Sequence, residues 1–189
     1  MKKYCLPLLF GLLLLGGCGS SMKDQSYTLQ GTLTDSGFEG RTVFLKDGVK
    51  GTIVYDSAQV SHGKFVFTGR QDTIVVRELY VQQNDSDAYP LTIPVVLEPG
   101  EIQVTLGDIV AVKNTPLNNT LMEFLLAKDQ FMAKDFSDKE VADVKKEFSE
   151  LLVAWIAQNV DNAVGKYIYE AYSNKLDAEQ KMQMSKFVK

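Results

Sequence analysis

Tyr27-Thr28-Leu29-Gln30-Gly31-Thr32-Leu33 is the stretch that decides the fold of this 189-residue chain. Apolar and polar residues alternate along it, as they do in a β-strand that is buried on one face. Similar short runs continue to about Val112, with turn-forming residues between them. This pattern predicts about six or seven short strands arranged as an antiparallel sandwich or barrel.

Two turns are marked especially clearly in this half of the chain. Val60-Ser61-His62-Gly63 separates the strands expected at residues 52–55 and 64–68. It predicts a hairpin between them, with Gly63 at a positive φ. Glu98-Pro99-Gly100-Glu101 predicts a second tight turn between two later strands.

Beyond the last expected strand, apolar residues recur three and four positions apart, which predicts helices. Ser137-Asp138-Lys139-Glu140 matches a capping box and predicts the start of one of them. The expected buried stripe of that helix contains Val141, Val144, Phe148, Leu151 and Trp155. Asp161 or Asn162 could cap a further helix, and Asp177 with Gln180 the last one. We therefore expect an α+β fold, with a β-sandwich-like domain at residues 27–113 and an all-helical segment at residues 114–189.

The N-terminus predicts where the protein resides. Lys2 and Lys3 precede an apolar run at residues 6–15, which is typical of a secretory signal peptide. This run is too short to cross a bilayer as a permanent helix, which takes roughly 20 apolar residues. The net charge of −4 gives no reason to expect a nucleic-acid partner, because such proteins usually carry a basic patch.

Leu15-Gly16-Gly17-Cys18 resembles the lipobox of bacterial lipoproteins. This resemblance implies that residues 1–17 are removed and that Cys18 becomes the lipidated first residue, anchored in the membrane by several acyl chains. The alternative is an ordinary signal peptide with a cysteine there by chance. Residues 18–26 then form a short tether. Because Gly19 is not aspartate, the resemblance favours an outer-membrane lipoprotein of the cell envelope, on the periplasmic face.

Several motifs occur in a fixed order along the strands. They are Tyr27-x-x-x-Gly31, Val43-Phe44-Leu45, Tyr55-Asp56-Ser57-Ala58, Gly63-Lys64-Phe65-x-Phe67-x-Gly69 and Leu97-Glu98-Pro99-Gly100. Together they resemble the domain of unknown function 4369 family, and Asn114-Thr115-Pro116-Leu117-Asn118 is similar to that family's passage into helices. The resemblance implies the N-terminal domain of envelope lipoproteins that continue into a thioredoxin-like domain. This sequence has no Cys-x-x-Cys pair, so we expect the accessory half without the thioredoxin domain or its thiol chemistry.

Candidate site residues are few. His62 is the only histidine and lies in an expected turn, so we predict no catalytic residue, metal site or cofactor. Asn84-Asp85-Ser86-Asp87 could hold calcium weakly but lacks the glycine and glutamate of a calcium loop, and we interpret it as a solvated loop. Thr73 and Ser57 each lie in a three-residue pattern that resembles a bacterial O-glycosylation acceptor, although a structural role is the other interpretation of Ser57.

The functional hypothesis is a lipid-anchored, non-catalytic binding or accessory module. Its expected partners are the membrane, through the lipid on Cys18, and another envelope protein, for which the resemblance suggests a thiol–disulfide lipoprotein. The alternative is a structural envelope component or a carrier that binds glycan or lipid. A hydrolase is the third class considered. An exposed apolar surface would favour the accessory module, an internal apolar cavity the carrier, and a polar cleft near His62 the hydrolase.

Overall fold

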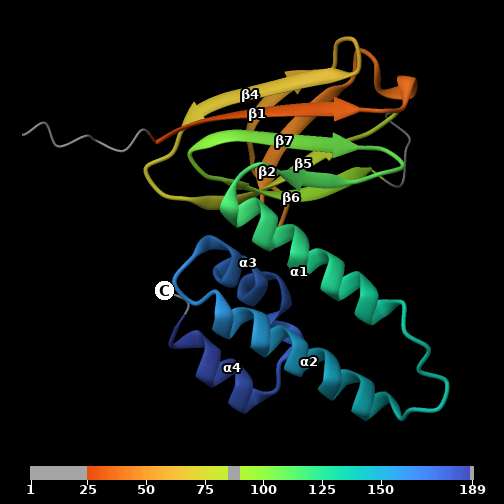
Figure 1. Ribbon diagram of the computed structural model, residues 1–189, viewed down its shortest axis with the longest axis vertical. Helices are drawn as coiled ribbons and strands as arrows, with labels where there is room; N and C mark the ends of the chain where they lie inside the picture. Colours follow the sequence, from red (N-terminus) through yellow and green to blue (C-terminus); the bar gives the residue numbers. More distant parts are fainter. Residues whose placement is uncertain (1–24, 85–89, 188–189) are drawn as a thin grey trace, which may run out of the picture.

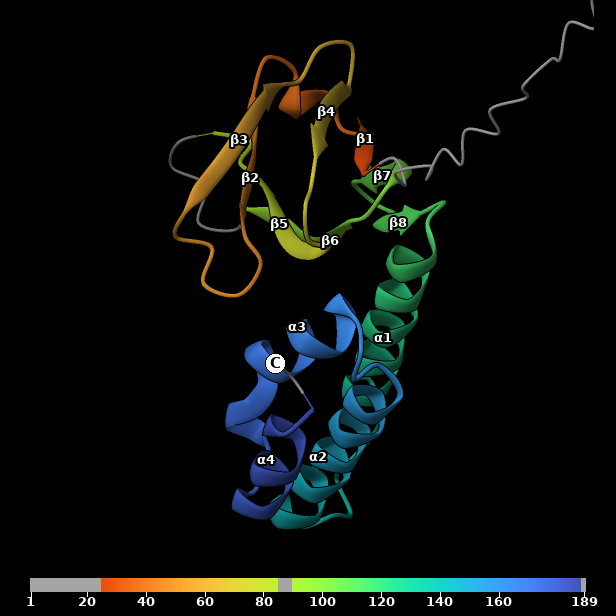
Figure 2. The same ribbon diagram turned by 90° about the vertical axis from the view of Figure 1, so that its left-hand side faces the viewer.

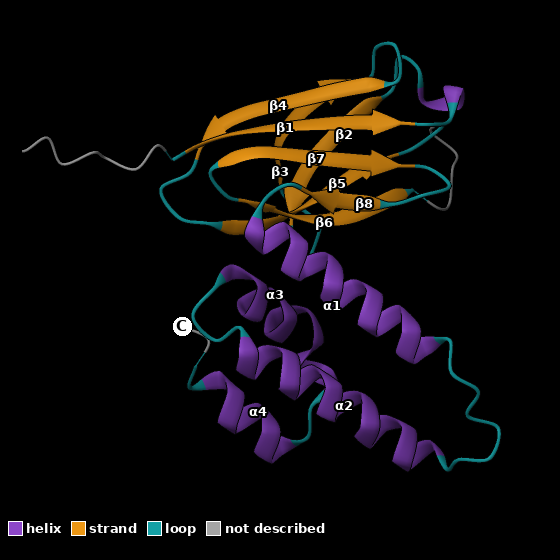
Figure 3. Cartoon of the chain, viewed as in Figure 1, coloured by secondary structure: helices purple, strands orange, loops and turns teal. Residues whose placement is uncertain are grey.

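The computed structural model describes residues 25–84 and 90–187. Two β-sheets lie face to face above a group of helices, which confirms the expected α+β fold (Figures 1 and 3). The strands are β1 (Ser26–Leu33), β2 (Thr42–Asp47), β3 (Val54–Gln59), β4 (Lys64–Arg70), β5 (Val75–Val81), β6 (Leu91–Leu97), β7 (Gly100–Leu106) and β8 (Ala111–Lys113). The helices are α1 (Pro116–Met132), α2 (Val141–Gln158), α3 (Ala163–Tyr172) and α4 (Ala178–Ser185), with short 3-10 turns η1 (Ser36–Phe38) and η2 (Ser173–Lys175).

The strand order is β4-β1-β7-β8 in one sheet and β3-β2-β5-β6 in the other. Neighbouring strands are antiparallel except β1 and β7, which are parallel. The sequence predicted only antiparallel pairs, so this pair is a correction. It arises because the chain builds all four strands of the second sheet between β1 and β7, and then returns to the first sheet in the direction of β1.

The turn at residues 60–63 is where the sequence predicts it, but the predicted hairpin is wrong. His62 and Gly63 both have positive φ, at 53° and 66°. However, β3 before the turn pairs with β2, while β4 after it pairs with β1 in the other sheet. The turn at Glu98-Pro99 likewise leads from one sheet to the other. Turn residues fix the reversal of the chain but not the layer that the next strand joins.

Two aromatic rings lie over glycines on the neighbouring strand inside the sandwich. Phe65 is opposite Gly31, and a Cβ atom on Gly31 would lie 1.9 Å from the Phe65 ring. Tyr27 is opposite Gly69, where an added Cβ would lie 2.8 Å from the Tyr27 ring. A glycine is therefore needed at each of these positions to make room for a large ring across the strand pair.

Two hydrophobic cores hold the molecule together. Between the sheets, fully buried side chains include Leu29, Val43, Leu79, Val95 and Ile102. Below the sandwich, a second core joins the helices to the outer face of β6 and includes Val96, Leu121, Phe124, Leu152, Ile156 and Ile168. Since β6 contributes Val95 to one core and Val96 to the other, it is the strand that the two halves share.

The start of α2 differs from the prediction. Its N-cap is Glu140, with no side-chain hydrogen bond, and the Ser137 N–H instead donates to the Asp135 carboxylate. The predicted capping box at Ser137 is therefore wrong. The cap of α3 is Asn162, and Asp177 with Gln180 forms the capping box of α4, as the sequence predicts.

The buried face of α2 is also shifted from the predicted stripe. Its buried residues are Ser149, Leu152 and Ile156, while Val141 is 68% exposed. Ser149 can be buried because its hydroxyl donates to the Lys146 carbonyl and accepts from the Gln180 side chain of α4. In a hydrophobic pattern a serine is assigned to the solvent-facing side of a helix. The sequence therefore could not indicate that the hydrogen-bonded Ser149 lies on the buried face of α2.

Gly31→Ala should lower the free energy of unfolding by about 1–3 kcal/mol, because the new methyl group enters the space of the buried Phe65 ring. Urea unfolding followed by circular dichroism measures the change. Thr32→Ala, on the exposed side of the same strand, is the control and should be close to neutral.

The double variant Gly31→Ala/Phe65→Leu tests whether contact with the ring is the cause. The smaller side chain makes room for the methyl group, so the loss should be smaller than the sum of the two single losses. Additive losses would mean that the glycine is required for another reason.

Candidate functional site

A buried polar cluster joins the sandwich to the helices. The Asn118 side chain, on the first turn of α1, is fully buried and pairs with the backbone of Val96 on β6. The Val96 N–H donates to Asn118 Oδ1, and Asn118 Nδ2 donates to the Val96 carbonyl, both at 2.8 Å. The amide thus bonds to the edge of β6 as a further strand would.

Glu98 and Thr115 complete this cluster, and both are buried. The Asn118 backbone N–H donates to Glu98 Oε1 at 2.9 Å, and Asn118 Nδ2 also contacts Glu98 Oε1 and Thr115 Oγ1. Two sequence motifs, at residues 97–100 and 114–118, therefore meet in space. Every polar group named here has a partner, so we assign this cluster a structural role.

One end of the sandwich gathers the start of β1 and three connections between strands. The pairings place Tyr27 beside Gly69 and Gly100, and place Asp47 beside Arg77. The connections at residues 48–53, 71–74 and 98–99 therefore lie where the chain enters β1, and this end faces the viewer in Figure 2. We call it the N-terminal end of the sandwich.

The connection between β2 and β3 is folded around the Asp47 carboxylate. Its two oxygens accept hydrogen bonds from the backbone N–H groups of Val49, Lys50, Thr52 and Ile53, at 2.6–3.4 Å. These bonds, with that of Ile53 the largest contributor, hold the Asp47 pKa well below its usual range. The loop therefore has a defined conformation although it is largely exposed.

Large apolar side chains project from this end. Val49, Ile53, Val54, Tyr55 and Ile74 are all exposed, Ile53 by 56%. The Arg77 guanidinium lies 3.8 Å from the centre of the Tyr55 ring. The sequence pattern predicted a strand at residues 52–55, and the structure starts β3 at Val54, so only Thr52 and Ile53 belong to the loop. The turn signal at residues 46–48 indicated that the chain reverses there, but not how long the loop is or that these apolar side chains are exposed.

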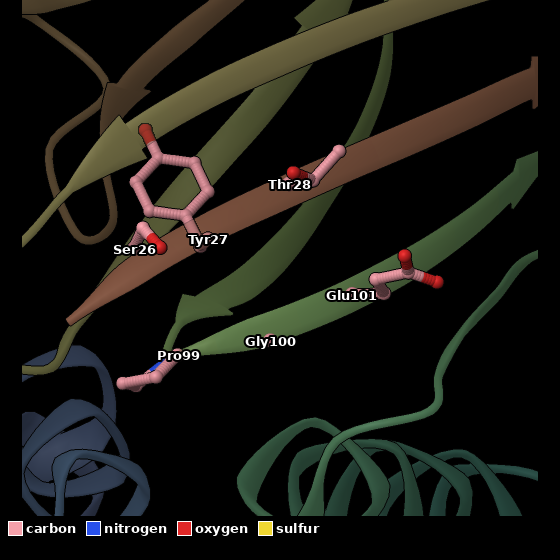
Figure 4. Close-up of a pocket in the computed structure, with 6 residues that line it drawn as sticks. All are labelled: Ser26, Tyr27, Thr28, Pro99, Gly100 and Glu101. Carbon is pink, nitrogen blue, oxygen red and sulfur yellow. The ribbon is translucent and has the colours of Figure 1, made fainter. Parts of the chain in front are cut away.

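A shallow hollow of about 420 Å³ lies at the same end of the sandwich, where β1 and β7 begin. It is lined by Ser26, Tyr27, Thr28, Pro99, Gly100 and Glu101 (Figure 4). The Tyr27 ring turns toward β4, while the Glu101 carboxylate points along β7 away from it. The polar groups do not converge on one point, so the geometry presents no catalytic arrangement there.

His62 lies exposed in its turn, on the opposite end of the sandwich. Its ring Nδ1 is 3.1 Å from the hydroxyl of Ser61. The nearest carboxylate, Glu39, accepts from the backbone N–H groups of Gly63 and His62, which lower the Glu39 pKa. Glu39 therefore holds the turn and does not orient the imidazole as a catalytic triad requires.

The other predicted site residues do not come together. Ser57 is exposed on the edge strand β3, and Thr73 is exposed in the connection between β4 and β5. Cys18 and Asp85-Ser86-Asp87 lie outside the described residues. Within residues 25–84 and 90–187, no group of three His, Cys, Asp or Glu side chains is placed to hold a metal ion.

Two exposed apolar side chains lie at the two ends of the connection between α1 and α2. Met132 ends α1 and is 66% exposed, and Val141 begins α2 with its side chain also exposed. Beneath them Phe131 packs against Phe136 and Phe148, with ring centres 5.2 Å apart in each pair. We call residues 132–141 the helical tip. The packed aromatic rings stabilise its conformation.

The helical tip points away from the N-terminal end of the sandwich. Helix α1 starts beside the buried Asn118 cluster and runs for 17 residues, about 25 Å, to Met132 (Figure 1). The two exposed apolar surfaces are therefore separated by the length of this helix.

A family model matches this chain. The family model described as a domain of unknown function, DUF4369, matches residues 27–121, which is half of the chain. The match covers the sandwich and the first turns of α1, including the Asn118 cluster. No curated protein matches the sequence. In the part of the chain that the structure describes, no helix is both long and apolar enough to cross a membrane.

Replacing Asn118 tests the joint between the two halves. Asn118→Ala removes the partners of the Val96 N–H and carbonyl and should cost about 2–4 kcal/mol, since these buried groups are left unsatisfied. Chemical denaturation measures the loss. Asn119→Ala, the exposed neighbour on the same helix turn, should change the stability little; equal losses would contradict a special role for Asn118.

Asp47→Asn tests the loop at the N-terminal end. Ionised Asp47 has a depressed pKa in the folded chain, so it stabilises the fold above its ordinary pKa of 3.8, and this stabilisation is lost as the pH falls below that value. Wild type should therefore lose more stability than Asp47→Asn between pH 7 and pH 3. Unfolding curves at both pH values measure this, and an identical pH dependence would contradict it.

Proposed function

This chain belongs to the DUF4369 family, and from that premise we propose that it is a lipid-anchored, non-catalytic accessory protein of the cell envelope that contacts another envelope protein. The family description assigns no activity, so the proposal rests on the surfaces of this chain and on its N-terminal sequence. The observation that carries it is the exposed apolar pair Met132 and Val141 on the helical tip.

The helical tip is suited to contact a protein. An exposed apolar surface beside charged side chains is the usual composition of a docking site. A shallow hollow at the start of α2 is lined by five acidic residues and two lysines, with Lys139 paired to Glu147: Asp138, Lys139, Glu140, Asp143, Lys146, Glu147 and Glu150. The acidic rim favours a partner that presents apolar and basic groups.

The anchor in this proposal is the lipid on Cys18. The lipobox-like Leu15-Gly16-Gly17-Cys18 supports it, and Gly19 supports the periplasmic face of the outer membrane. Seven residue steps separate Cys18 from Gln25, the first described residue, so the tether spans at most about 25 Å. The sandwich is then held near the bilayer while the helical tip is free to meet a partner.

A thiol–disulfide lipoprotein is the partner class that we propose. The family resemblance associates this N-terminal domain with thiol–disulfide lipoproteins. The only cysteines of this chain are Cys5 and Cys18, so a thiol reaction would take place on the partner. The interior between the sheets is filled by buried side chains, which favours the accessory role over the carrier alternative.

Crosslinking in intact cells, followed by purification of the chain and identification of what is bound, tests this proposal. We expect an envelope protein, in the first place a thiol–disulfide lipoprotein, to be recovered with the wild type. Met132→Asp/Val141→Asp should reduce its recovery by about tenfold or more, since it places charges in the apolar contact.

Two controls separate the surface from the anchor. Val66→Asp makes the same chemical change at an exposed valine on β4 and should leave recovery unchanged. Cys18→Ala removes the proposed anchor and should release the chain from the membrane fraction. Recovery of glycan or lipid without a protein partner would support the carrier alternative instead.

A further inference from the structure

We propose that the N-terminal end of the sandwich rests on the lipid bilayer, with the loop between β2 and β3 in the headgroup layer. The inferred ligand of this surface is therefore the membrane itself. The inference rests on the proposed anchor at Cys18 and adds to it a defined, oriented contact. It is drawn from the position of the tether, the distribution of apolar side chains and the hydrogen bonding of the loop.

The position of the tether is the first argument. The chain enters β1 at Ser26, beside Arg70 at the end of β4, and near Gly100 at the start of β7. A lipid on Cys18 then lies at most about 25 Å from this end of the sandwich. The start of β1 lies at the end of the sandwich that faces the viewer in Figure 2.

The distribution of apolar side chains is the second argument. Five large exposed apolar residues lie at the N-terminal end: Val49, Ile53, Val54, Tyr55 and Ile74. The rest of the described sandwich exposes Val66 on β4, and Ile109 and Val110 at the opposite end. Exposed apolar surface is therefore concentrated at the end from which the tether leaves, as expected of a face that contacts lipid.

The hydrogen bonding of the loop is the third argument. Backbone N–H groups that enter an apolar layer without partners are costly. In this loop the N–H groups of Val49, Lys50, Thr52 and Ile53 already donate to the Asp47 carboxylate. The loop can therefore enter the headgroup layer with these donors satisfied, while the exposed side chains of Val49 and Ile53 are available to contact lipid.

The aromatic and charged residues at the N-terminal end of the sandwich are of the types found at the membrane interface. Tyr55 is half exposed and carries the Arg77 guanidinium on its ring, a combination suited to the boundary between headgroups and acyl chains. Exposed charges of both signs occur at this end, among them Lys50, Arg70 and Asp72. The contact is therefore apolar in origin, and it should persist in high salt and without anionic lipid.

The test uses fluorescent probes on single cysteines. Cys18 is the only cysteine after residue 17 and carries the proposed lipid, so an added cysteine is the only free thiol. Ile53→Cys and Val49→Cys place an environment-sensitive dye on the loop, and Ile109→Cys places it at the opposite end on a 71% exposed position. The lipidated full chain is inserted into phosphatidylethanolamine–phosphatidylglycerol vesicles that contain a lipid-borne quencher.

We expect a blue-shifted emission at positions 53 and 49, and quenching about twofold or more stronger than at position 109. Equal and weak quenching at all three positions would overturn the inference. Circular dichroism of each labelled chain shows whether it is folded, and having two loop positions guards against a local effect of the dye.

Flotation of the same vesicles measures the anchor separately. If the chain floats but the loop probes remain in water, the anchor stands and the oriented contact is wrong. If the chain made in cells carries no lipid and remains soluble, the proposed anchor is wrong and this inference fails with it.

Discussion

The arrangement of the molecule depends on one buried side-chain amide. Strand β6 is an edge strand of its sheet, and Asn118 bonds to both the N–H and the carbonyl of Val96 at that edge. This closes the edge against further strand pairing and fixes the start of α1 at the same time. Because Val96 also packs among the helices, the second hydrophobic core forms directly over this hydrogen-bonded contact. An apolar residue at position 118 could supply packing but neither hydrogen bond.

The elements that the sequence predicts well are those set by neighbouring residues. The alternation in residues 27–33, the positive φ of Gly63 and the caps at Asn162 and Asp177 all depend on atoms a few positions away. The parallel pairing of β1 with β7 depends on how the chain crosses between two layers, which no local pattern contains. Ser149 shows the same limit, since its burial requires Gln180, 31 positions further on.

The candidate surfaces were less predictable than the fold. Thr52 and Ile53 fit a strand by composition, and only the backbone hydrogen bonds to the Asp47 carboxylate show that the chain still bends there before β3 begins at Val54. Val141 fitted the expected buried stripe of α2 and is exposed in the structure, because a helical period does not say how far a hydrophobic core extends along a helix. The proposed anchor, in contrast, comes from a local pattern, since the lipobox-like motif around Cys18 is only four residues long.

The buried amide also has a mechanical consequence. Four hydrogen bonds join Asn118 of α1 to Val96 and Glu98 of the sandwich, so a rotation of the helices relative to the sheets would have to break them. Helix α1 then acts as a lever arm of about 25 Å whose pivot lies at the sandwich. A small tilt of the sandwich therefore moves the helical tip sideways by a larger distance. A force applied to the tip acts on the sheets as a torque. The orientation of the sandwich therefore determines where the helical tip lies.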